Sequence, residues 1–174
     1  GIMGGIHSGC TDNTVNVFLE GAYFDPVRTA YTGRALKINS DARYRFERGI
    51  DASWTPVGIE AASQMILDLC GGTASEVVIA GAQPDHARAY QLDTDRIQSL
   101  VGMELPEAEQ RVTLTALGFD LQGDMAHVPG WRPDIMGEAD LVEEVARVAS
   151  LTKLQGKPLP RLQSGVPKAI LSPI

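Results

Sequence analysis

The sequence lacks long apolar runs, a cysteine framework and an excess of positive charge. No apolar run approaches the roughly 18 residues that a membrane-spanning helix requires, and no signal peptide is present, so we expect a cytoplasmic protein without a membrane partner. The two cysteines, Cys10 and Cys70, show no metal-type spacing, and we expect free thiols in a reducing compartment. The 15 Lys and Arg are outnumbered by 22 Asp and Glu, and the net charge of −7 argues against a chain that wraps nucleic acid by itself.

The composition is that of an ordinary globular chain. Hydrophobic residues make up 44% and charged residues 21% of the 174 positions, which is enough apolar material for a buried core. The chain begins inside a Gly-rich apolar segment and stops at Ser-Pro-Ile. We expect a piece of a longer protein, divided into two small modules and a tail.

The first predicted module spans residues 1–83. A Gly-rich segment, GIMGGIHSG, precedes a strand predicted over 14–24, and Asp25-Pro26 opens a helix that runs to about Leu36. A polar segment follows, and Thr55-Pro56 starts a second helix that Gly71-Gly72 ends. Residues 76–80 are predicted to form a closing strand.

The second predicted module spans residues 89–152. It is expected to hold a short strand, two short helices ended by Gly102 and Gly118, a hairpin around Gly123-Asp124 and a final acidic helix. Four prolines make residues 153–174 an expected extended connector. The predicted fold class is α+β, with two small mixed α/β modules, the second resembling a helix–hairpin–helix unit.

The segment WRPDIMGEADLVEEVAR, residues 131–147, carries the strongest chemical pattern. A turn at Arg132-Pro133 lets Asp134 project, and a helix is predicted to begin near Glu138 or Ala139. Asp140, Glu143 and Glu144 recur at i, i+3 and i+4, so their carboxylates lie together on one face. Like charges at this spacing destabilise an isolated helix by roughly 0.2–0.5 kcal/mol per pair. A Mg²⁺ ion would compensate them, but a solvated acidic face near a helix N-terminus explains the pattern as well.

Three other features leave alternatives open. The glycines of residues 1–9 are not followed by the crossover helix of a dinucleotide site, and they indicate close backbone approach to a ligand or a strand. Glu20, at the end of a predicted strand, is either a solvent-facing acid or a carboxylate that accepts a hydrogen bond from a ligand hydroxyl. The sequence RYRFERG, residues 43–49, fits an RNA contact, although an amphipathic turn with Glu47 paired to an arginine explains it more simply.

Taken together, these motifs resemble the beta subunit of bacterial phenylalanyl-tRNA synthetase. The resemblance rests on GIMGG, NVFLEGAYFDP, TGR, SDARYRFERG, CGG and WRPDI…EADLVEEVAR, which fall in the family's order along nearly the whole chain. It implies that residues 1–83 are the C-terminal part of a tRNA-editing domain and that residues 89–152 are the family's fifth module. The tail would then lead toward a catalytic-like domain that this chain lacks.

The resemblance also implies roles for individual residues. Glu20 matches the acid of the editing pocket that recognises the tyrosine hydroxyl. Gly4, Ser40 and Ala42 match positions that line the same pocket. Ser40 stands where relatives often carry threonine, so a hydroxyl is kept and a methyl group is lost. The resemblance further implies that four acids bind Mg²⁺ near the alpha subunit: Asp134, Asp140, Glu143 and Glu144.

The implied parent is an (αβ)2 enzyme that uses ATP and Mg²⁺ to join phenylalanine to tRNA(Phe). Its beta subunit would contribute proofreading, tRNA binding and assembly, and the fragment alone is expected to be inactive. An apolar synthetic site rejects an added hydroxyl only about a hundredfold, and a second site that selects the hydroxyl can hydrolyse the wrong ester. Two alternatives remain: a stand-alone hydrolase of mischarged tRNA and a nucleic-acid-binding module.

Overall fold

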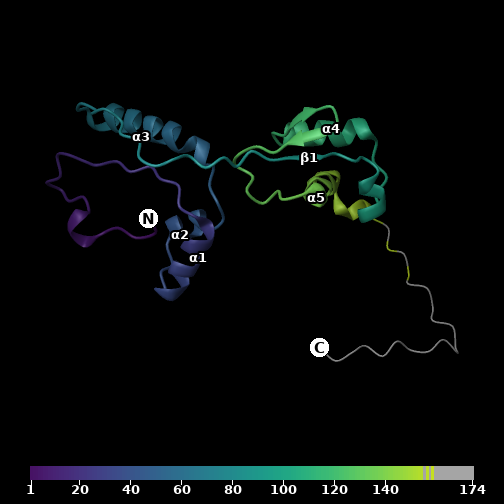
Figure 1. The fold of residues 1–174 in the computed structure, drawn as a ribbon, viewed down its shortest axis with the longest axis horizontal. Coiled ribbons are helices and arrows are strands. Elements are labelled where there is room, and N and C mark those ends of the chain that lie inside the picture. The colour runs from purple at the N-terminus through teal and green to yellow at the C-terminus, as the bar shows by residue number, and fades with distance from the viewer. Residues whose placement is uncertain (155, 157, 159–174) are drawn as a thin grey trace, which may run out of the picture.

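The computed structural model describes residues 1–154, 156 and 158 and shows a mixed α/β chain (Figure 1). The first part contains η1 (Ile6–Ser8), α1 (Pro26–Ala35), α2 (Asp41–Phe46), η2 (Ala52–Trp54) and α3 (Thr55–Cys70). The second part contains β1 (Ala89–Gln91), η3 (Ile97–Val101), α4 (Glu107–Ala116), β2 (Asp120–Gln122), β3 (Met125–His127), α5 (Glu138–Ala149) and η4 (Leu151–Lys153). No helix among the described residues is long and apolar enough to cross a bilayer. The predicted connector, 153–174, falls mostly outside the described residues.

Local capping signals explain the helices of the first part. The Asp25 carboxylate accepts a hydrogen bond from the Arg28 amide at 2.7 Å, and Pro26 occupies the first turn, so the predicted start of α1 is confirmed. The predicted helix after Thr55 is also confirmed, and it ends where Gly71 adopts a φ of 73°. The short helix α2 was not predicted. Ser40 caps it by accepting a hydrogen bond from the Arg43 amide at 3.1 Å.

The strands predicted over residues 14–24 and 76–80 are wrong for this structure. Both segments have extended or irregular backbone and belong to no sheet. A strand needs a partner that completes its hydrogen-bond ladder, and nothing in the described part of the chain pairs with either segment. Their alternating apolar side chains are consequently exposed, with Val15 at 89%, Phe18 at 91% and Val78 at 88%.

A small antiparallel sheet organises the second part, with strand order β1-β3-β2. The predicted hairpin is confirmed: Leu121 lies opposite Ala126, and Gly123 in the turn has a φ of 61°. Ala126 also lies opposite Tyr90 of β1 and is fully buried at the centre of the sheet. The sheet therefore presents one face to the helices of this part.

The hydrophobic core cluster found among the described residues lies in the second part. It gathers side chains from η3, α4, the sheet and α5: Leu92, Ile97, Met103, Leu114, Phe119, Ala126, Ile135, Leu141, Val142, Val145, Ala146 and Ala149. On α5, Leu141 and Val145 are buried, four residues apart, whereas Val148 is 50% exposed. The buried face is rotated toward Val142, Ala146 and Ala149 because α5 packs against both α4 and η3.

Candidate functional site

The acidic segment is organised by a guanidinium group. Arg132 donates to both carboxylate oxygens of Asp134, with a shortest distance of 2.6 Å, and to Glu144 at 2.9 Å. It thereby links the turn before α5 to the second turn of the helix. These charge-assisted bonds lower the pKa of Asp134, and hydrogen bonding to Arg132 is the largest cause.

Glu144 is an acid inside the fold rather than on a solvated face. Its side chain is only 9% exposed, and a second guanidinium, that of Arg147, donates to it at 2.6 Å. Hydrogen bonds from Arg132 and then from Arg147 lower its pKa, against the opposing effect of burial. The repulsion expected from the acidic spacing is therefore relieved by two arginines.

The other two acids have different surroundings. The Asp140 carboxylate accepts a hydrogen bond from the Met136 amide at 2.7 Å and so closes the turn that leads into α5. Glu143 is exposed and makes no hydrogen bond within the part of the chain that the structure describes. The four predicted metal ligands are thus neighbours in sequence but differ in their partners. Asp134 and Glu144 bind Arg132, Asp140 binds the Met136 amide, and the Glu143 side chain is exposed to solvent.

This arrangement does not fit a magnesium site. A Mg²⁺ ion needs near-octahedral oxygen ligands at about 2.0–2.1 Å, yet Asp134 and Glu144 already direct their oxygens at guanidinium groups. No group of three or more metal-ligating side chains converges among residues 1–154. The Arg132 guanidinium lies between the Asp134 and Glu144 carboxylates, where a metal ion bound by both would have to lie.

Sequence reasoning missed Arg88, which holds the same turn from the other side. Its guanidinium donates to the carbonyl oxygens of Arg132 at 2.9 Å, Pro133 at 3.2 Å and Ile135 at 2.8 Å. These hydrogen bonds join residues more than 40 positions apart in the sequence, so no local sequence pattern predicts them. Arg88 and Arg132 together fix the turn on which Asp134 projects.

The predicted editing-pocket residues lie around the N-terminal segment. The Ser40 hydroxyl donates to the carbonyl oxygen of Ile2 at 2.8 Å, two residues before Gly4, and Ala42 lies one position into α2. The Glu20 carboxylate lies 3.5 Å from the N-terminal amino group of Gly1. The Ser40 hydroxyl thereby joins the start of α2 to the segment that precedes Gly4.

Glu20 also lines an open cavity of about 400 Å³ under α3. The cavity walls include Phe46, Trp54 and Ile59, so the carboxylate stands at the rim of a largely apolar hollow. Its side chain is 59% exposed and available to an incoming donor. Gly4, Ser40 and Ala42 do not line this hollow in the described structure.

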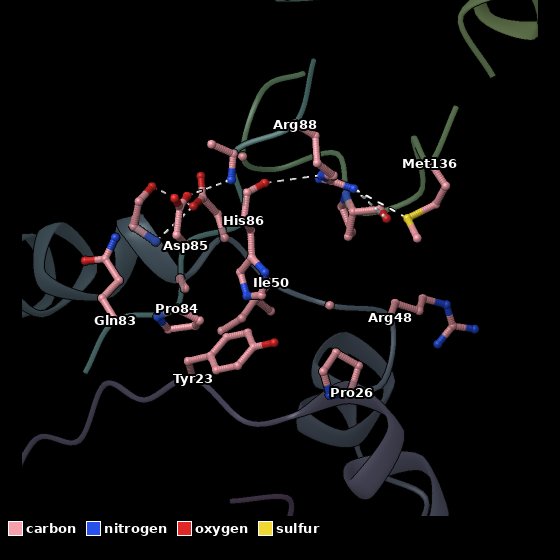
Figure 2. A pocket seen from close by; sticks show the side chains of 17 residues that line it. Tyr23, Pro26, Arg48, Ile50, Gln83, Pro84, Asp85, His86, Arg88 and Met136 are labelled. Atoms are coloured by element: carbon pink, nitrogen blue, oxygen red, sulfur yellow. Dashed lines mark hydrogen bonds between the residues drawn. The ribbon is translucent and has the colours of Figure 1, made fainter. Parts of the chain in front are cut away.

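A larger hollow of about 670 Å³ lies where the two parts of the chain meet (Figure 2). Tyr23 and Pro26 form one wall, and His86 and Arg88 lie across from them, with the Tyr23 and His86 rings 5.3 Å apart. Gly49 lies against Pro133, and its φ of 89° favours glycine. The hollow is bounded by loops and linker residues and brings together none of the predicted editing residues.

Both parts of the chain match known domain families. Residues 1–71 match the B3/4 domain family, and residues 90–150 match the tRNA synthetase B5 domain family. The arginine-bound turn and α5 therefore fall in the B5 match, and Glu20 falls in the B3/4 match. The second match places this part of the chain among the domains of tRNA synthetases.

Similar proteins of known name identify the family to which the whole chain belongs. The chain is 70% identical over 173 residues to the phenylalanine–tRNA ligase beta subunit of Ruegeria pomeroyi, with 99% of this chain and 22% of that protein covered. It is 70% identical over its whole length to the corresponding subunit of Cereibacter sphaeroides, and 48% identical over 177 residues to that of Paramagnetospirillum magneticum. The chain belongs to the phenylalanine–tRNA ligase beta subunit family, and it spans about a fifth of the length of these relatives.

Proposed function

We propose that this chain works as part of a full-length beta subunit that pairs with an alpha subunit to charge tRNA(Phe) with phenylalanine. The observation that carries the proposal is the match over the whole chain, at 70% identity, to proteins named as this subunit. The exposed apolar segments of the first part support it, because large apolar side chains such as Phe18 and Val78 require covering partners. The boundaries 1–83 and 89–152 are proposed as its editing and B5 units.

Within that assembly, we propose that the first part contributes to proofreading of tyrosyl-tRNA(Phe). Glu20 would accept a hydrogen bond from the tyrosine hydroxyl, which phenylalanine lacks, while Gly4, Ser40 and Ala42 would shape the surrounding pocket. The exposure of the Glu20 carboxylate and the Ser40–Ile2 hydrogen bond support these roles. A hydrogen bond to a charged acceptor contributes roughly 1.5–3 kcal/mol, which is enough for the discrimination required.

Magnesium ligation by Asp134, Asp140, Glu143 and Glu144 is proposed only for the assembled enzyme. Two of these acids bind Arg132 in the described structure, so ligation would require that Arg132 release them when a partner subunit is present. Glu143 is exposed, and its side chain has no competing hydrogen bond within the described residues.

The rival function, a stand-alone hydrolase of mischarged tRNA, is tested by comparing this chain with the assembled enzyme. Tyrosyl-tRNA(Phe) deacylation is measured for the 174-residue chain alone and for the full-length protein assembled with the alpha subunit. We expect hydrolysis only by the assembled protein, because the hollow beside Glu20 is open and neither histidine nor cysteine lines it. Equal rates for the two proteins would contradict the proposal and favour the rival.

A further inference from the structure

Positive charge is concentrated in one short stretch of this acidic chain. Residues 26–48 hold six of the 15 Lys and Arg but only two of the 22 Asp and Glu. This stretch forms α1, α2 and their connection, which lie side by side (Figure 1). The charge segregation makes α1–α2 a positive surface on a protein whose formal charge is −7.

One of the six cations is used inside the helix pair. The Arg43 side chain packs over Gly33 of α1, donates to the Ile38 carbonyl at 2.6 Å and pairs with Glu47 at 2.9 Å. The predicted pairing of Glu47 with a neighbouring arginine is thereby confirmed. It accounts for Arg43. Arg48 has local partners too, since it donates to the Tyr44 carbonyl at 2.8 Å, but its side chain stays exposed like those of the other four cations.

The available cations are exposed and carry few partners. They are Arg28, Arg34, Lys37, Arg45 and Arg48. Among the described residues, only Arg48 approaches a carboxylate, that of Glu47, at 3.5 Å. In the second part, by contrast, Arg96, Arg111 and Arg147 each pair with an acid.

Aromatic side chains lie between these cations. Arg28, Tyr31 and Arg34 recur at i, i+3 and i+6 and so share the face of α1 opposite the buried Thr29 and Gly33. Tyr31 is 67% exposed. On α2, Tyr44 is 58% exposed, and the Arg48 guanidinium lies 3.6 Å from the centre of its ring.

We propose that the α1–α2 surface, defined as Arg28, Tyr31, Arg34, Lys37, Tyr44, Arg45 and Arg48, binds a strand of RNA. Arginine and lysine bind phosphates, and exposed tyrosine rings stack on unpaired bases, so the two kinds of side chain together match an RNA strand better than an acidic polypeptide. The choice of tRNA as the RNA rests on the proposed function. The surface itself rests on charge, exposure and aromatic spacing.

The test measures how salt weakens tRNA binding to the full-length protein assembled with the alpha subunit. Each phosphate contact contributes about 0.7–0.9 to the slope of log Kd against log salt concentration. Removing two contacts with Arg28→Gln and Arg34→Gln should therefore lower the slope by about 1.5. Fluorescence anisotropy of labelled tRNA(Phe), between about 50 and 200 mM KCl, gives the slope.

The matched control removes the same charge from the second part, with Arg96→Gln and Lys153→Gln. We expect the control to keep the wild-type slope. Either an unchanged slope in the Arg28/Arg34 variant, or the same loss in both variants, would overturn the inference. Circular dichroism checks that each variant keeps its helices.

A second variant, Tyr31→Ala, separates stacking from charge. Base stacking on an aromatic side chain is worth about 1–3 kcal/mol, so its loss should weaken binding at least about fivefold without changing the salt slope. Wild-type affinity in Tyr31→Ala would contradict RNA as the occupant. If the Arg28/Arg34 variant binds tRNA like the wild type while Glu20→Ala still loses editing, this inference fails and the proposed function stands. If the variant loses binding while Glu20→Ala edits like the wild type, the inference stands and the role proposed for Glu20 fails.

Discussion

Replacing Glu20 with alanine in the assembled full-length enzyme should lower the rate of tyrosyl-tRNA(Phe) hydrolysis about tenfold to hundredfold. The carboxylate is the proposed acceptor for the tyrosine hydroxyl, and a hydrogen bond to a charged group contributes roughly 1.5–3 kcal/mol. Mischarged tRNA should then accumulate during charging with tyrosine. The measurement is the first-order loss of labelled tyrosine from preformed tyrosyl-tRNA(Phe).

Glu60→Ala provides the control, because Glu60 is another exposed acid of the first part and lies on α3, away from the hollow that Glu20 lines. This variant should deacylate at the wild-type rate. Glu20→Gln, which keeps an oxygen acceptor without the charge, should lie between wild type and Glu20→Ala. Wild-type hydrolysis by Glu20→Ala would refute the role proposed for Glu20.

Glu144→Gln should lower the free energy of unfolding of the second part by about 1.5–3 kcal/mol. The substitution weakens charge-assisted bonds to Arg132 and Arg147 while leaving both guanidinium groups without their shared carboxylate. Glu143→Gln should change it by less than about 0.5 kcal/mol, because that side chain is exposed and unbonded within the described chain. Urea-induced unfolding measures both.

The stabilisation by Glu144 should also depend on pH in a defined direction. Its folded-state pKa is lowered from the ordinary value of 4.5, so its contribution is complete above that value. It declines as the pH falls through the lowered folded-state pKa, because protonation removes the charge that the arginines bind. The stability difference between wild type and Glu144→Gln should therefore be present at neutral pH and shrink in strong acid.

The same pair of variants separates the structural role from metal ligation. If Arg132 and Arg147 are the partners of Glu144, only Glu144→Gln should destabilise the fold. If the acids bind Mg²⁺ in the assembled enzyme, both Glu143→Gln and Glu144→Gln should weaken the Mg²⁺ dependence of subunit association. A loss of stability in Glu143→Gln equal to that in Glu144→Gln would contradict the arginine network.

The sequence predicted those elements whose signals are local. The start of α1 follows from Asp25-Pro26, and the end of α3 follows from Gly71, because caps act over one helical turn. The hairpin follows from a glycine turn between two short apolar segments. The helix α2 was missed because its six residues are far fewer than the roughly 11–18 over which a helical apolar pattern can be recognised.

The errors have non-local causes. Residues 14–24 carry a strand-like alternation, but alternation does not supply the neighbouring strand that a ladder needs. The site was incompletely predicted for the same reason. The acidic spacing on α5 was visible in the sequence, whereas the selection of Glu144 by Arg132, 12 residues away, depends on how the turn packs on the helix.

The most direct test of the account is phenylalanine charging by the full-length protein co-expressed with the alpha subunit. We predict that the two subunits co-purify and attach phenylalanine to tRNA(Phe) when ATP and Mg²⁺ are supplied. Failure to pair or to charge, together with hydrolysis of mischarged tRNA by this chain alone, would contradict the account and identify a free-standing editing hydrolase.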